Sequence, residues 1–195
     1  MRGDRGMSLE KSSSLKLKEF FLWMTRKSFS QLGVGDTQIT EYIASLLTDF
    51  SRADRWTMLR DAEGKRLSSV VDMMIAQLGP DSAGRVVEER AVRKYIGDYT
   101  LFMSGLFRGF VERGGYLDYY LEEGKRSYRA VSKLDVSLYR PGFLMFEELS
   151  KGFENYAGAL DFMRKCYFAP SLGQDPFAGL LKQVEGWMQT RLSNN

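Results

Sequence analysis

The stretch YIGDYTLFMSGLF, residues 95–107, is apolar nearly all round when it is read as a helix. One apolar stripe recurs at helical spacing through Val92, Ile96, Tyr99, Met103, Leu106 and Phe110, and Leu101, Phe102 and Phe107 widen it. A helix without a polar side is buried at the centre of a helical domain. We therefore expect a central helix over residues 85–113.

Helical periodicity continues on both sides of this segment. Further helices are predicted at residues 15–32, 37–50, 66–78, 116–134, 143–168 and 176–192. No run alternates with the period of two that a half-buried strand requires. The predicted fold class is therefore all-α, a single-domain irregular bundle of about seven helices over residues 15–195. Residues 1–14 are polar and rich in Gly and Ser, and we expect them to form a flexible tail.

The segment 143–168 carries an apolar stripe with alternating spacings of three and four. Its members are Phe146, Leu149, Phe153, Tyr156, Leu160, Met163 and Tyr167. This spacing predicts one unbroken helix that packs along the central helix. Because the stripe is largely aromatic, and one small bundle does not easily cover so much aromatic surface, we expect a homodimer.

The predicted helix LKLKEFFLWMTRKSFSQL, residues 15–32, combines large aromatic residues with Lys and Arg. This composition is typical of a helix that docks on a protein partner or rests on a membrane surface. A core helix has the same composition and is the default interpretation, so we do not expect membrane contact. The candidate interface residues of the whole chain are Phe20, Phe21, Trp23, Phe146, Phe153 and Tyr156.

Three glycines, Gly97, Gly105 and Gly109, lie on one side of the predicted central helix. Each costs roughly 1 kcal/mol relative to alanine in a helix interior. Close approach of a neighbouring helix would offset this cost, and so would a pocket for a small apolar molecule or lipid. Close helix packing is the more common reason.

Asp98 lies where the central helix becomes apolar all round, so its carboxylate needs a partner if it is buried. Lys94 is one helical turn away and could provide an ion pair. The alternative is a functional role, because buried charged groups also mark binding sites. The candidate ligand-binding residues beside the glycines are Lys94, Asp98, Gly105, Tyr120 and Tyr128.

The stretch LEEGKRSYR, residues 121–129, contains the Gly-Lys pair of a phosphate-binding loop. It lacks the rest of that motif, because Tyr119 stands at the first glycine and Arg126 at the hydroxyl residue. The spacing instead predicts a helix with Leu117, Leu121, Gly124, Tyr128 and Val131 on its core side. On its polar side Glu122 and Arg126 have the order of an i,i+4 ion pair.

The composition excludes several classes of chemistry. The chain has no histidine, so catalytic triads and ordinary di-iron sites are excluded, and we expect no catalytic residue, metal or cofactor. The net charge of +3 is too small to favour nucleic-acid binding. The single cysteine, Cys166, and the lack of a long apolar run predict a soluble protein of a reducing cytoplasm.

The stretches YIGDYTLFMSGLF, YLDYYLEEGKRSYRAV and FEELSKGFENYAGALDFM resemble a family of bacterial helical proteins with no assigned activity. The resemblance covers roughly residues 36–168. It implies a bacterial origin and an all-helical fold. It draws attention to seven residues without giving them roles: Gly97, Asp98, Gly105, Tyr119, Tyr120, Gly124 and Tyr128.

Taken together, these patterns predict a non-enzymatic helical binding or protein-interaction module of a bacterial cytosol. Its partner would be another protein or a second copy of the chain. The alternative is a helical protein that binds a small molecule or lipid beside the Gly97, Gly105 and Gly109 stripe.

Overall fold

The computed structural model describes residues 4–51 and 86–168, and the side chains from residue 15 onward. These residues form helices joined by short turns and contain no strand, which confirms the predicted all-α fold. The helices are α1 (Asp4–Gln31), α2 (Thr37–Phe50), α4 (Val86–Leu106), α5 (Arg108–Arg113), α6 (Leu117–Ser137), α7 (Phe143–Lys151) and α8 (Phe153–Tyr167). The predicted helices at 66–78 and 176–192 lie outside the described residues.

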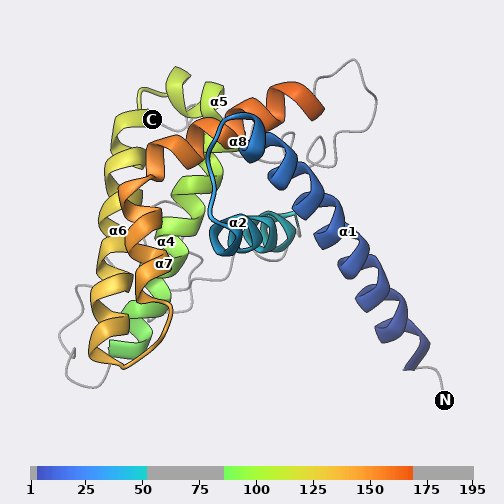
Figure 1. Cartoon of the computed structure of the whole chain (residues 1–195), viewed down its shortest axis with the longest axis horizontal. Coiled ribbons are helices and arrows are strands. Elements are labelled where there is room, and N and C mark those ends of the chain that lie inside the picture. The colour runs from blue at the N-terminus through green and yellow to red at the C-terminus, as the bar shows by residue number, and fades with distance from the viewer. Residues whose placement is uncertain (1–3, 52–85, 169–195) are drawn as a thin grey trace, which may run out of the picture.

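Helix α4 lies at the centre of the described bundle. It packs against α6, α8 and α2, and α7 lies along α6 (Figure 1). Every residue from Ile96 to Leu106 is buried, as the all-round apolar pattern predicts. Burial of these side chains on all sides is the main favourable contribution that α4 makes to folding.

Helix α1 begins at Asp4, inside the segment expected to be a tail, and its N-terminal half extends away from the other described helices (Figure 1). Its C-terminal half packs on α2 and α8 through Phe21, Met24 and Phe29, which are buried. The helix ends at Gln31, and Gly33, two residues later, has a φ of 64°, a left-handed conformation that most residues adopt only at a cost. The flexibility of residues 1–14 stays a prediction.

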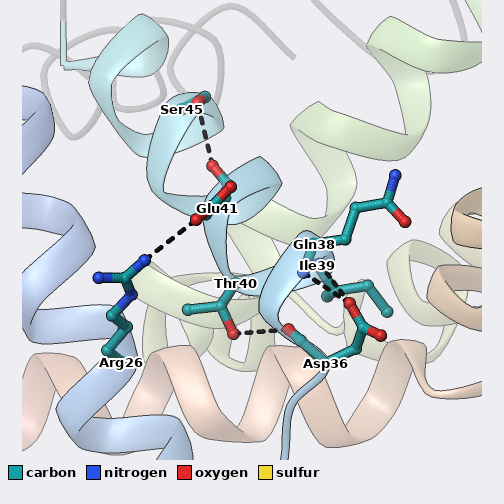
Figure 2. A network of polar contacts seen from close by, with 7 residues as sticks. All are labelled: Arg26, Asp36, Gln38, Ile39, Thr40, Glu41 and Ser45. Carbon is teal, nitrogen blue, oxygen red and sulfur yellow. Dashed lines mark hydrogen bonds and ion pairs between the residues drawn. The ribbon is translucent and has the colours of Figure 1, made fainter.

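The N-terminus of α2 is fixed by Asp36 (Figure 2). The Asp36 carboxylate accepts hydrogen bonds from the backbone N–H groups of Gln38 at 2.6 Å and Ile39 at 3.3 Å. These bonds satisfy donors that have no partner within the first turn of a helix. Arg26 of α1 then forms an ion pair of 3.0 Å with Glu41, which connects α1 with α2 on the surface.

Two predicted long helices are each interrupted once. The helix expected over 85–113 breaks at Phe107, where φ is −111° and ψ is 25°, and continues as α5. The break leaves carbonyl groups at the end of α4 without helical partners, and the Arg164 guanidinium donates a hydrogen bond to one of them, the Leu106 carbonyl.

The second interruption, at Gly152, divides the segment 143–168 into α7 and α8. The prediction of one unbroken helix was therefore wrong, whereas the apolar stripe does face the core as predicted. Six members of the stripe are buried, from Phe146 to Met163, and Tyr167 is partly buried. The change of direction lets α7 follow α6 while α8 crosses α4.

Glycines bring the central helices close together. A Cβ atom on Gly97 would lie 2.7 Å from the Tyr128 ring, and one on Gly105 would lie 2.6 Å from Leu160. A Cβ atom on Gly124 would lie 2.1 Å from the Phe153 ring. Close packing thus explains Gly97 and Gly105 of the predicted stripe. Gly109 is different, because the nearest atom to its Cβ position is Arg113 Nη1 at 3.8 Å.

We predict that Gly124→Ala destabilises the protein by about 1–3 kcal/mol, because the added methyl group would overlap Phe153. Gly158→Ala in α8 is the matched control, since no atom lies within 4 Å of its Cβ position. This control should be stabilising by about 0.5–1 kcal/mol through helix propensity. Urea unfolding monitored by circular dichroism measures both changes, and equal effects of the two substitutions would contradict the close packing.

Candidate functional sites

Three carboxylates among the described residues are buried, on α4 and α6. Asp98 is 7% exposed, Glu123 2% and Asp135 0%. A buried carboxylate is stable in its charged form only when it is paired or hydrogen-bonded. If each of these three acids is paired within the fold, none of their carboxylates is free to bind a ligand.

Asp98 accepts hydrogen bonds from three helices. One carboxylate oxygen accepts from the Tyr42 hydroxyl of α2 and from the Tyr128 hydroxyl of α6, the latter at 2.9 Å. The other oxygen accepts from Lys94 Nζ at 2.6 Å, as the i,i+4 spacing predicts. The Lys94 ammonium also lies 5.0 Å from the centre of the Tyr42 ring.

The other two buried acids pair with arginines of α4. Asp135 accepts two hydrogen bonds from Arg90, through Nε and through Nη2 at 2.9 Å. Glu123 is 3.3 Å from Arg93 and also 3.3 Å from Arg126, and Ser127 donates to it at 3.2 Å. Glu122 pairs with Lys125 at 3.0 Å. The ion pair expected between Glu122 and Arg126 is therefore replaced by two i,i+3 pairs.

The buried phenols are held in their neutral form. Burial, and then the charge of Asp98, raise the pKa of Tyr42 and of Tyr128 well above the ordinary value of 10.0. Burial also raises the pKa of Tyr95 to about 12. Neutral phenols donate hydrogen bonds to Asp98 but are poor bases at neutral pH. The geometry is that of a closed structural network.

The structure brings together three of the five predicted ligand-binding residues, Lys94, Asp98 and Tyr128. Tyr120 lies elsewhere, with its ring 6.1 Å from that of Tyr99, and the position beside Gly105 is filled by Leu160. The sequence reasoning missed five residues of these buried polar contacts: Tyr42, Arg90, Arg93, Glu123 and Asp135. The burial of Asp135 could have been predicted, because it follows Tyr128 and Val131 at helical spacing on the core side of α6.

The predicted interface residues divide into two groups. Phe21, Phe146, Phe153 and Tyr156 are buried within one chain and are not available to a partner. Only Phe20, 42% exposed, and Trp23, 54% exposed, lie at the surface. The bundle itself covers the three predicted interface residues of segment 143–168, Phe146, Phe153 and Tyr156. An interface along this segment stays a prediction.

Phe20 and Trp23 belong to what we call the outer face of α1: Lys16, Phe20, Trp23 and Lys27, spaced four, three and four residues apart. The Lys27 ammonium lies 5.0 Å from the centre of the Trp23 ring, and the Tyr167 ring of α8 meets Trp23 edge to face at 5.8 Å. An open hollow lies beside Trp23, lined also by Glu19, Leu22, Arg26 and Lys27.

Comparisons of the chain with family models, with curated proteins and with solved structures give no match. The resemblance to a bacterial helical family stays a prediction. Within residues 4–51 and 86–168, no group of three or more His, Cys, Asp or Glu side chains is placed to hold a metal ion. No helix in these ranges is long and apolar enough to cross a membrane.

We predict that Asp98→Asn lowers the free energy of unfolding by about 1–3 kcal/mol, because Lys94 and the two phenols lose a charged acceptor. The loss stays below that of a fully buried pair, since the Lys94 side chain is 35% exposed and can reach water. Asp118→Asn, at an exposed acid of the first turn of α6, should change stability by less than about 0.5 kcal/mol. Chemical denaturation of both variants tests this, and a similar effect of the two would mean that the Asp98 network adds no stability.

We also predict a loss of stability at alkaline pH. Below pH 10 both states keep the Tyr42 and Tyr128 phenols protonated, whereas above it only the unfolded state releases these protons. Because the folded-state pKa is raised, stability is complete below about pH 10 and falls as pH rises further. Urea unfolding between neutral pH and pH 11 should show this fall, and Tyr128→Phe should make it less steep. An unchanged slope in that variant would contradict the assignment.

Proposed function

We propose that the chain is a non-enzymatic protein-interaction module of a bacterial cytosol that binds its partner through the outer face of α1. One observation carries the proposal: Phe20 and Trp23 are exposed on a helix whose opposite side is buried in the bundle. Tryptophan is one of the residue types that most often dominate the binding energy of protein interfaces.

The buried polar groups support a non-enzymatic role. Asp98, Glu123 and Asp135 each have a basic partner within the fold. The chain also lacks histidine, the residue most often used for proton transfer at neutral pH. A protein that works by binding needs neither a free base nor a nucleophile.

The outer face of α1 offers useful binding energy. Full burial of an aromatic side chain contributes about 1.5–3 kcal/mol, so covering the exposed halves of Phe20 and Trp23 would contribute about 1 kcal/mol each. Trp23 is already oriented by Tyr167 and Lys27, which reduces the entropy lost on binding. The hollow beside Trp23 could accept a side chain of the partner.

The predicted alternative, a small-molecule or lipid pocket beside the glycine stripe, receives less support. Tyr128 and Leu160 occupy the space next to Gly97 and Gly105. A homodimer was expected because the aromatic stripe of residues 143–168 would need a cover. The described bundle already covers this stripe within one chain, so the stripe no longer supports a homodimer. The outer face of α1 retains two exposed aromatic side chains, Phe20 and Trp23, that a partner would cover.

We predict that Phe20→Ala and Trp23→Ala together abolish the binding of the protein's partner. The test is affinity capture from the native host with wild-type and variant chains, followed by quantitative mass spectrometry of the captured proteins. Leu144→Ala is the matched control, because Leu144 is 59% exposed on α7, away from α1. A partner that the double variant retains, or that Leu144→Ala loses to the same extent, would contradict the proposal. Thermal unfolding checks that both variants are folded.

A further inference from the structure

The charge of the outer face of α1 identifies the kind of partner that it fits. We propose that the partner contributes an acidic helix, in which carboxylates flank apolar residues that cover Phe20 and Trp23. This inference rests on the proposed function, because it concerns the same surface.

Positive charge predominates on this part of α1. Residues 15–31 include four basic residues, Lys16, Lys18, Arg26 and Lys27, and one acid, Glu19. Arg26 is already paired with Glu41 (Figure 2). Among the described residues, no acid lies within ion-pair distance of Lys16, Lys18 or Lys27. Two of the three, Lys16 and Lys27, belong to the outer face, and Lys27 also lies over the Trp23 and Tyr167 rings. With no acid of the described residues beside them, these two ammonium groups can pair with carboxylates of a partner.

The arrangement of the face also restricts the shape of the partner. Lys16 and Lys27 are eleven residues apart, which corresponds to about 16 Å along a helix axis. Phe20 and Trp23 lie between them on the same side of α1. A partner helix packed along α1 would meet both lysines if its own carboxylates were about eleven residues apart, with apolar residues between them. Charge complementarity of this kind fixes register and speeds association.

A second copy of the chain fits this face poorly. In an antiparallel pair centred between Phe20 and Trp23, Lys16 of one copy would lie opposite Lys27 of the other. In a parallel pair each lysine would face its own equivalent. Both arrangements bring like charges together, which is unfavourable at an interface.

An anionic membrane surface also fits poorly. A helix that lies in a membrane inserts a continuous apolar side among the lipids. In α1 that apolar side, with Phe21, Met24 and Phe29, is buried in the bundle. The outer face presents only two aromatic side chains next to lysines, and Glu19 beside them would be repelled by anionic lipids.

The proposal can be tested by selection from a phage-displayed library of helical peptides of about 18 residues, long enough to span both lysines. The bait is the full chain, and peptides that also bind the Phe20→Ala, Trp23→Ala variant are removed. We expect enriched peptides to carry Asp or Glu on both sides of an apolar cluster. Their affinity should fall about tenfold for Lys16→Glu, Lys27→Glu, and selection on that charge-reversed chain should enrich basic peptides instead.

Other outcomes would overturn the proposal in distinguishable ways. Peptides that need Trp23 but show no preference for acidic residues would refute the acidic helix and leave the proposed binding face intact. If no peptide is left once those that bind the Phe20→Ala, Trp23→Ala variant are removed, both the partner class and the proposed function fail. Trp23-dependent sedimentation with phosphatidylglycerol vesicles would identify a membrane surface instead. A Trp23-dependent dimer in analytical ultracentrifugation would identify a second copy.

Discussion

The arrangement of the central helices depends on the buried carboxylate of Asp98. By accepting hydrogen bonds from Tyr42 and Tyr128, it connects α4 to α2 on one side and to α6 on the other. The Tyr128 ring lies against Gly97, where any larger residue would displace it. An unpaired charge at this position is costly because it is removed from water. Moving a helix away would therefore cost more free energy than the loss of a single hydrogen bond. The network therefore favours a single arrangement of the three helices.

Ion pairs give the α4–α6 interface its register. Arg90 meets Asp135 and Arg93 meets Glu123, so two basic groups near the N-terminus of α4 pair with acids of α6. Apolar side chains alone would tolerate a shift of one helical turn, whereas such a shift would separate these charges. Buried ion pairs are weak contributors to net stability but can discriminate between alternative packings. We interpret them here as determinants of register.

Local patterns predicted much of this structure. The all-round apolar sequence around Leu101 identified the central helix, and the i,i+4 spacing identified the pair of Lys94 with Asp98. Contacts between distant residues could not be predicted, because nothing in a helical pattern near Asp98 points to Tyr42, 56 residues earlier. The breaks at Phe107 and Gly152 were also missed, since the apolar period runs through them unchanged. For the same reason the sequence could not show which aromatic residues the bundle covers.

The glycine contacts limit how these helices can vary. At each contact one helix contributes no side chain and its neighbour contributes a large one, as with Gly124 and Phe153. No residue is smaller than glycine. The glycine can therefore be replaced by a larger residue only if the large side chain that packs against it is replaced by a smaller one. Substitution at such a pair without loss of stability needs two coordinated changes, whereas a position such as Gly158 can vary alone. The close contacts should therefore be the slowest-evolving and most strongly coupled positions in the core.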